Sequence, residues 1–213
     1  MRLISVNTGG PRDVESRGRV VRTSIWKTPR QGRLRVSTEN VDGDEQSDPT
    51  VHGGIYKAVY CYPSEHYDYW RRQLPGMDLP WGVFGENLTT EGLLETGVRI
   101  GDRIQIGSAE FSITQPRQPC FKLGIRFGRD DMVKRFVASG RSGFYVRVLR
   151  EGEIEAGDDI RILERAADSM TVSDIFALKF DDDEARSGDW RRAAHAPGLS
   201  PGWKDDFMRR LER

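Results

Sequence analysis

Short runs of alternating apolar and polar residues dominate the first 165 residues. In RIQI (103–106) both isoleucines fall on one face, and FYVRV (144–148) alternates in the same way. A period of two bounded by Gly, Asp or Pro predicts half-buried β-strands. Further runs of this kind are RLISV (2–6), RVVRTSIW (19–26), RLRVST (33–38), YKAVYCY (56–62) and AEFSITQ (109–115). Many short strands joined by Gly-rich turns favour a barrel or sandwich, so the fold class is mainly β (α+β).

Two segments within this β-rich region have helical spacing instead. One is expected to begin after Ser64 and to present an apolar face from Tyr67 to Leu74. The other follows Asp131, presents apolar residues every three to four positions and ends at Gly140. Ser and Asp are favourable at helix N-termini, and Gly is favourable just past the C-terminus. Both faces are interpreted as core packing.

The pattern changes near residue 165. Helical periodicity covers 171–179, 189–194 and 203–211, and Ser200-Pro201-Gly202 is a typical helix start. We therefore expect two domains, a β domain over 1–165 and a three-helix extension over 166–213. Fewer than 50 residues bury little surface alone, so the extension should pack on the β domain or on another subunit.

Composition narrows the protein class. The chain has 213 residues, is 37% hydrophobic and 31% charged, and contains no apolar run near the roughly 20 residues of a membrane helix. The N-terminus has no secretory pattern, so a cytoplasmic protein that does not span the membrane is expected. Its formal net charge is zero, which argues against binding a nucleic-acid polymer by bulk electrostatics.

The zero net charge conceals two basic blocks. Residues 1–40 carry nine basic and three acidic side chains, and 115–150 carry nine and two, whereas 41–100 carry four and ten. If the two basic blocks meet in the fold, they form a site for an anion; otherwise they are solvated surfaces.

The segment ITQPRQPCFKLG (113–124) contains the strongest candidate for chemistry. Cys120 follows two prolines and is flanked by Arg117 and Lys122, and nearby cations favour a thiolate that reacts or ligates a soft metal. The alternative is a small buried hydrophobe. Cys61 lies in an apolar strand and is expected in the core. No CxxC or HxxxH pair is present, so a structural zinc site is not expected.

Three other segments carry polar groups that suit ligand binding. In the acidic loop VDGDEQSDPTVHGG (41–54), His52 could donate to an anion or relay a proton, and Gly53 allows close backbone approach. An anchored loop explains the same residues. FGENLTTEG (84–92) offers donors at Asn87 and Thr89, which equally suit a simple turn. His66 and His195 are expected at the surface.

The third segment follows the strand RVVRTSIW. Lys27, Thr28 and Arg30 combine an ammonium, a hydroxyl and a guanidinium at a strand end, a set that binds phosphate. Solvated loop charge is the alternative.

Together these motifs resemble the MOSC domain, the molybdenum-cofactor sulfurase C-terminal type, in its YiiM-like branch. IWKTP, DGD…HGG…KAV…YP, FGENLTTEGL, GDRIQIG and QPRQPCFKLG occur in the family's order over roughly residues 1–165. The tail from MTVSDIFAL resembles the three-helix extension of the same branch.

The resemblance implies a closed or partly closed β-barrel that holds a molybdopterin-type molybdenum cofactor. It makes Cys120 the molybdenum ligand and assigns the cofactor's terminal phosphate to Lys27 and Thr28, with Arg30 nearby. Arg117, His52 and Asn87 are further candidates for contacting the pterin or the substrate, and Gly53, Thr89 and Lys122 complete the predicted cofactor-binding set. Whether purified protein retains the cofactor is left open.

The family's activity is the reduction of N-hydroxylated compounds such as hydroxylaminopurines, with His52 a proton-donor candidate. The chain has no GxGxxG motif and no cysteine cluster, so an external flavin or iron–sulfur donor would supply electrons. Two alternatives stand beside this activity: a carrier of molybdenum cofactor or sulfur on Cys120, and an interaction module acting through the helical tail. Homodimerisation, partner docking and structural cover are all open roles for that tail.

Overall fold

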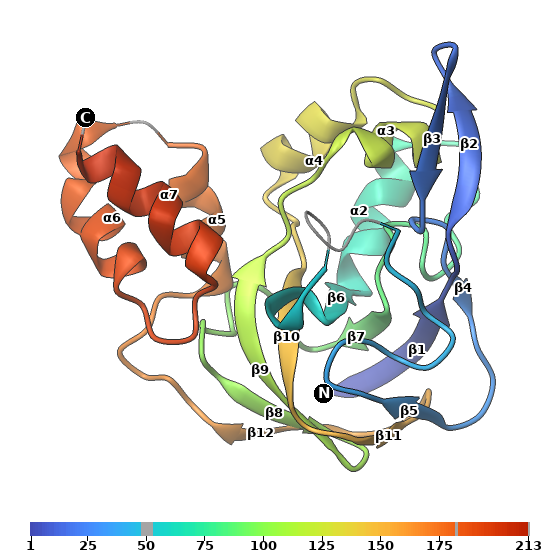
Figure 1. Ribbon diagram of the computed structural model, residues 1–213, viewed down its shortest axis with the longest axis horizontal. Coiled ribbons are helices and arrows are strands. Elements are labelled where there is room, and N and C mark those ends of the chain that lie inside the picture. Colours follow the sequence, from blue (N-terminus) through green and yellow to red (C-terminus); the bar gives the residue numbers. More distant parts are fainter. Residues whose placement is uncertain (48–52, 182, 213) are drawn as a thin grey trace.

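An eight-stranded mixed sheet lies at the centre of the computed structural model, which describes residues 1–47, 53–181 and 183–212 (Figure 1). The strand order is β12-β8-β9-β10-β6-β7-β1-β4, and every neighbouring pair is antiparallel except β6 and β7. These strands are β1 (Arg2–Thr8), β4 (Thr28–Pro29), β6 (Val59–Pro63), β7 (Leu88–Glu91), β8 (Arg103–Ile106), β9 (Ala109–Pro116), β10 (Phe144–Arg150) and β12 (Ile160–Glu164).

Two small sheets flank the main sheet. One is the hairpin of β2 (Arg12–Ser16) and β3 (Arg19–Thr23), and the other pairs β5 (Leu34–Val36) with β11 (Gly152–Ile154). The mainly β, α+β class predicted from alternation is confirmed, because the residues that alternate in RIQI and FYVRV form β8 and β10.

Among the described residues the sheet is not closed into a barrel, so of the two expected forms, closed or partly closed, the closed one is wrong. Its strand order has two ends, β12 and β4. The start of β1 nevertheless approaches the segment before β12: Leu3 N donates to Asp158 O at 2.9 Å, and Arg2 forms an isolated bridge with Asp159. Because β4 pairs only with Asn7 and Thr8, the same edge at the start of β1 is left for this approach, and Gly157 N also donates to Leu3 O at 2.7 Å and Ile160 N to Met1 O at 2.9 Å.

Helices cover one end of the sheet. α2 (Glu65–Gln73) follows Ser64 directly, and α4 (Met132–Ser139) ends at Gly140 in the left-handed conformation, as their sequence signals predict. α3 (Phe121–Phe127) has no counterpart among the helices that the sequence predicts. η1 (Ile55–Lys57) is a single 3₁₀ turn before β6.

An aromatic core joins these helices to the sheet. Tyr62, Tyr67, Trp70, Phe84 and Phe136 are fully buried and contact one another, with ring centroids of Tyr62 and Phe84 4.6 Å apart. Burying side chains of this size contributes a large share of the hydrophobic stabilisation. The core therefore fixes the turn that contains Phe84 against α2 and α4.

The C-terminal helices form a separate cluster beside β9 (Figure 1). They are α5 (Val172–Lys179), α6 (Ser187–Ala194) and α7 (Pro201–Leu211), with η2 (Glu184–Arg186) between the first two. Trp190, Trp203 and Phe207 belong to the same hydrophobic core as Ile104 and Phe111 of the sheet. The extension thus buries its apolar face on the β domain.

Among the described residues, none of the helices combines the length and apolar character needed to cross a membrane.

His66 is buried, so the expectation that it lies at the surface is wrong. Its Nε2 lies 2.8 Å from Glu95 Oε2, and Glu95 Oε1 accepts a hydrogen bond from Gly143 N at 2.6 Å. The helical turn that carries His66 faces the sheet rather than solvent because the buried Glu95 carboxylate lies opposite it. His195 is exposed, as expected.

Candidate functional site

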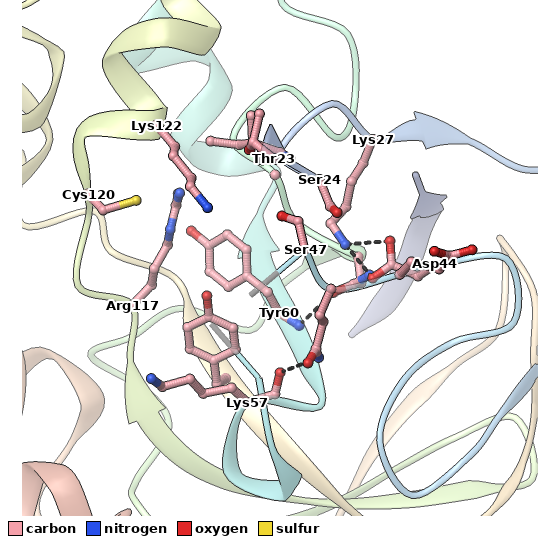
Figure 2. A pocket seen from close by; sticks show the side chains of 16 residues that line it. Thr23, Ser24, Lys27, Asp44, Ser47, Lys57, Tyr60, Arg117, Cys120 and Lys122 are labelled. Carbon is pink, nitrogen blue, oxygen red and sulfur yellow. Dashed lines mark hydrogen bonds and ion pairs between the residues drawn. The ribbon is translucent and has the colours of Figure 1, made fainter. Parts of the chain in front are cut away.

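The two basic blocks of the sequence meet at one pocket of about 600 Å³ that is open to solvent (Figure 2). Four basic and two acidic side chains line it, so an anionic ligand is favoured. The lining residues are Thr23, Ser24, Ile25, Lys27, Asp44, Glu45, Gln46, Ser47, Lys57, Tyr60, Gly85, Asn87, Arg117, Cys120, Lys122 and Tyr145.

Lys27 forms a buried ion pair on one wall. Its Nζ lies 2.5 Å from both carboxylate oxygens of Asp44, and the Lys27 side chain is only 9% exposed. Asn87 Nδ2 donates to Asp44 Oδ2 at 2.8 Å, and Gly9 N donates to Oδ1 at 3.0 Å. Burial lowers the pKa of Lys27 although the Asp44 carboxylate opposes this shift. The wall is thus a preorganised ion pair in which the Asn87 amide and Gly9 N hold the Asp44 carboxylate, and the carboxylate holds the Lys27 ammonium.

Arg117 forms the opposite wall with Lys122 and Cys120 (Figure 2). Its Nη1 donates to Phe84 O at 2.8 Å, and its guanidinium carbon lies 4.9 Å from the ring centroid of Tyr60. Burial acts to lower the pKa of Arg117, but the nearby hydroxyls of Tyr60 and Tyr145 outweigh it and raise the pKa overall. The guanidinium is therefore a fixed positive charge.

A buried glutamate organises the turn between the two walls. Glu86 is fully buried and accepts hydrogen bonds from Gly82 N at 2.8 Å, Phe84 N at 3.1 Å, Thr89 Oγ1 at 3.1 Å and the Tyr67 hydroxyl. Because Phe84 O in turn accepts from Arg117, this carboxylate fixes the backbone that orients the guanidinium.

The same turn lies against the strand end that carries Lys27. At Gly82, with φ +87°, an added Cβ would lie 2.8 Å from Lys27 O, and at Gly85, with φ +82°, it would lie 2.9 Å from Ile25 Cγ1. Only glycine allows this close approach together with a positive φ. One turn therefore contacts both cationic walls.

Cys120 lies at the pocket wall, immediately before the first residue of α3. The side chain is partly exposed and takes no part in a disulfide. Cys61 differs: it is fully buried in β6, as expected, and burial raises the pKa of its thiol. Of the two thiols, Cys120 is the one that faces the pocket.

The structure brings together five of the predicted site residues, namely Lys27, Asn87, Arg117, Cys120 and Lys122. Four of the other five are placed elsewhere. Thr28 and Arg30 are exposed at β4 and just beyond it, and Thr89 is fully buried behind the pocket, where it contacts Glu86. Gly53 lines a neighbouring groove, and His52 lies outside the described residues.

Several pocket residues were not identified from the sequence. The sequence presents Asp44 as one of many acids in a loop, and Tyr60, Tyr145 and Lys57 as strand residues, whereas the structure places all four at the pocket. The short acidic motif DGD was the available signal for Asp44, whereas nothing in the strand pattern distinguishes a tyrosine that lines a pocket from one in the core. Ser24 was also missed; its Oγ is buried and has no hydrogen-bond partner within the described part of the chain.

Within residues 1–47, 53–181 and 183–212, no group of three or more His, Cys, Asp or Glu side chains is arranged to hold a metal ion.

Two protein-family models match the chain. The MOSC domain matches residues 48–161, and the YiiM-like, 3-alpha helix domain matches residues 170–213. Among curated proteins, YflK of Bacillus subtilis strain 168 is 37% identical over 211 residues, covering 99% of this chain and 95% of YflK. The protein YiiM of Escherichia coli strain K12 is 34% identical over 207 residues, covering 89% of this chain and 90% of YiiM.

A fungal protein named a reductase, from Gibberella moniliformis, is 37% identical over 161 residues, which are 74% of this chain but 28% of the fungal protein. Among solved structures, YiiM from Geobacillus stearothermophilus has a TM-score of 0.83 and 34% identity, covering 99% of this chain and 98% of that one. YiiM from Escherichia coli has a TM-score of 0.75 and 29% identity, covering 100% and 93%.

Proposed function

This chain belongs to the MOSC domain family and carries the YiiM-like three-helix extension, and from that premise we propose that it is a molybdenum-cofactor-dependent reductase of N-hydroxylated compounds. The observation that carries the proposal is one pocket with a thiol on one wall and a buried lysine on the other, Cys120 and Lys27. A fungal relative named a reductase supports the oxidoreductase class.

The residues present fit an anionic cofactor that carries a soft metal. Arg117 supplies buried positive charge, Lys27 supplies a buried ammonium that is already paired with Asp44, and the Ser24 hydroxyl is a buried polar group without a partner in the described part of the chain. Cys120 would ligate the molybdenum, since a thiolate is a suitable soft ligand. Lys27 and Ser24 would hold the phosphate side, with Asn87 orienting the Asp44 partner of Lys27, and Arg117 with Lys122 would hold the pterin side. When bound, the cofactor supplies two-electron oxidoreduction.

The reaction consumes two electrons and two protons. A hydroxylamino group R–NHOH loses its oxygen as the N–O bond breaks, and R–NH₂ and water are the products. The electrons come from an external flavin or iron–sulfur protein, and the protons from groups at the pocket.

Lys57 is the proton donor we assign among the groups that line the pocket. It lies at the end of η1 on the pocket wall, and burial lowers the pKa of its ammonium group, so it releases a proton more readily than an exposed lysine. Its Nζ would donate to the departing oxygen. His52, outside the described residues, stays a predicted second donor.

Elemental analysis tests the cofactor assignment. Protein from a host that makes molybdenum cofactor should contain about one molybdenum per chain, and Cys120→Ala should lose it. Cys61→Ala is the matched control, because it removes the thiol that does not reach the pocket, and it should retain the metal. Equal molybdenum in Cys120→Ala and wild type would overturn the ligand assignment.

Measuring turnover distinguishes a reductase from a carrier of the cofactor or of sulfur. A chemically reduced sample with full metal occupancy should convert 6-hydroxylaminopurine to adenine. Full occupancy without turnover of this or other N-hydroxylated compounds would favour the carrier function, in which Cys120 holds the cofactor or sulfur for delivery.

A further inference from the structure

A groove of about 1040 Å³ lies between the β2–β3 hairpin and the α3–α4 segment, which stand side by side (Figure 1). We infer that this hairpin groove is the docking site of the electron donor, and that the donor is an acidic flavoprotein that exposes the edge of its flavin. The inference rests on the proposed reductase function and adds to it where the donor binds and which charge it carries.

Helix α3 separates the hairpin groove from the main pocket. Phe121 and Ile125 line the groove, whereas Cys120 and Lys122 line the pocket. Phe121 follows Cys120 directly in the chain. A donor seated in the groove is therefore next to the residue that would hold the metal.

The hairpin groove has an apolar centre that is open to solvent. Phe121 is 61% exposed, and Val14, Ile125 and Val133 of the same groove are half-buried. A large aromatic side chain left this exposed beside other apolar groups is typical of an interaction surface. Electron-transfer contacts are weak and bury little area, so a few apolar side chains suffice for one.

The charged side chains that line the groove are two basic and two acidic. Arg17 pairs with Asp130 at 2.6 Å and joins the hairpin turn to the segment before α4. Arg129 pairs with Asp131 at 3.0 Å. Glu15 lines the groove without an ion pair to any described residue. The attraction for a charged partner must therefore come from outside this lining.

Three arginines flank the groove without an ion pair in the described part of the chain, Arg12 and Arg19 on the hairpin and Arg126 on α3. Arg19 lies opposite Ser16 of the groove lining in the β2–β3 register. The guanidinium carbons of Arg12 and Arg126 lie 5.1 Å and 5.7 Å from the ring centroid of Trp26. Burial, and after it the neighbouring charge of Arg12, lowers the pKa of Arg126. Like charges gathered without a counter-charge favour an anionic partner.

The wider charge distribution has the same sign. Residues 11–30 carry six basic and two acidic side chains, and 117–141 carry seven and two. Because the formal net charge of the chain is zero, the remaining residues carry nine more acidic than basic side chains. The two basic segments meet at the groove and at the pocket, and the field of such a polarised molecule steers an acidic partner to this face.

A flavin matches the electron balance of the proposed reaction. Oxidation of a flavin hydroquinone to the quinone releases two electrons and two protons, the numbers that conversion of R–NHOH to R–NH₂ and water consumes. The ring edge that a flavin exposes is apolar, as is the centre of the hairpin groove.

Binding measurements test the docking site without turnover. The full chain is titrated with a bacterial flavodoxin, an acidic flavoprotein, and Kd should rise about tenfold between about 20 mM and about 200 mM NaCl. Arg12→Gln and Arg19→Gln should each slow association several-fold, and Glu15→Gln should speed it. Arg161→Gln is the matched control, because it removes the same charge from β12, at the far edge of the main sheet, and it should associate as wild type.

Phe121→Ala tests the apolar centre. It should raise the dissociation rate and leave the association rate nearly unchanged, because the side chain contributes buried area rather than charge. Far-ultraviolet circular dichroism and molybdenum content should match wild type, since the side chain is exposed. Leu163→Ala is the control, an exposed apolar side chain on β12, and it should dissociate as wild type.

Comparing two reductants distinguishes failure of the docking site from failure of the reductase. Reduced flavodoxin should drive conversion of 6-hydroxylaminopurine more slowly in Arg12→Gln and Arg19→Gln than in wild type, whereas dithionite should drive all three equally. No flavodoxin binding at low salt, or equal association rates in these variants and wild type, would overturn the docking site even if dithionite drives turnover.

The remaining outcomes assign the groove differently or support it. Reduction by an acidic ferredoxin but not by flavodoxin would overturn the flavin assignment. Self-association of the chain that Arg12→Gln and Arg19→Gln abolish would assign the groove to a second copy instead. The expected order of association rates, without turnover under either reductant, would support the docking site and contradict the reductase.

Discussion

The Nζ of Lys27 lies 2.5 Å from both carboxylate oxygens of Asp44, and this buried pair forms one wall of the candidate site. The two residues reach each other from the end of the first hairpin and from the loop after β5. A buried pair of this kind depends on both partners, because either one alone is an uncompensated charge.

Replacing Asp44 by asparagine should therefore destabilise the fold. The Asp44→Asn variant leaves the Lys27 ammonium buried without its counter-charge, and we expect a loss of about 3 kcal/mol in the free energy of unfolding, measured by urea denaturation. Asp13→Asn is the control. Asp13 forms a solvent-exposed ion pair with Arg22, so removing this pair should change the free energy of unfolding little. Equal effects of the two substitutions would contradict the importance of burial.

Arg117→Lys tests the geometry of the opposite wall. A lysine keeps the charge but loses the planar guanidinium that stacks on Tyr60 and donates to Phe84 O. We expect molybdenum content to fall several-fold while the far-ultraviolet circular dichroism is unchanged. Arg141→Lys is the matched control, since Arg141 stacks on Tyr69 outside the pocket, with its guanidinium carbon 3.8 Å from the ring centroid. Full molybdenum in Arg117→Lys would show that positive charge alone suffices.

Glu86 makes stability depend on pH in a defined direction. Burial raises the pKa of Glu86 above its ordinary value of 4.5, although hydrogen bonds from Tyr67 and Gly82 act against the shift. Folded protein therefore retains the proton to higher pH than unfolded chain does. The stability contributed by Glu86 is fully present below pH 4.5 and is lost as pH rises through the raised folded pKa.

Glu86→Gln reveals this dependence because glutamine does not titrate. The unfolding free energy of wild type minus that of the variant should decrease as pH rises above about 4.5. Urea denaturation at a series of pH values measures it. A difference that grows with pH would mean that the folded state favours the carboxylate.

The sequence predicts β1, β3, β5, β6, β8, β9 and β10, two of the helices beside the sheet and the C-terminal helices, because each follows from local periodicity and local end signals. It does not predict β2, β4, β7, β11 or β12. It does not predict α3. Two prolines before Cys120 indicate a loop, and the helix that follows is only seven residues long and contains Gly124. Tertiary packing of Leu123 and Phe127 in the aromatic core stabilises it instead.

The sequence predicts only part of the candidate site, because here too tertiary contacts decide which side chains are buried. Lys27 and Thr28 are adjacent, yet Lys27 is buried against Asp44 and Thr28 is exposed on a two-residue strand. Two residues are too few to show an alternating pattern. The sequence therefore does not indicate that the side chain of Lys27 is buried and that of Thr28 exposed. The partnership with Asp44 joins separate segments and appears only when the loop folds over the strand end.

The proposed role of Lys57 predicts a pH profile for turnover. A proton donor must be protonated to act, so kcat/KM for 6-hydroxylaminopurine should fall as pH rises through the pKa of Lys57, which burial lowers from its ordinary 10.5. Lys57→Gln should lower kcat and abolish this alkaline limb, while molybdenum content stays at the wild-type level. Lys179→Gln is the control, because Lys179 lines the neighbouring groove that contains Gly53, outside the pocket, and is held by Asp206. It should keep the alkaline limb, and an alkaline limb that persists in Lys57→Gln would assign the proton to another group.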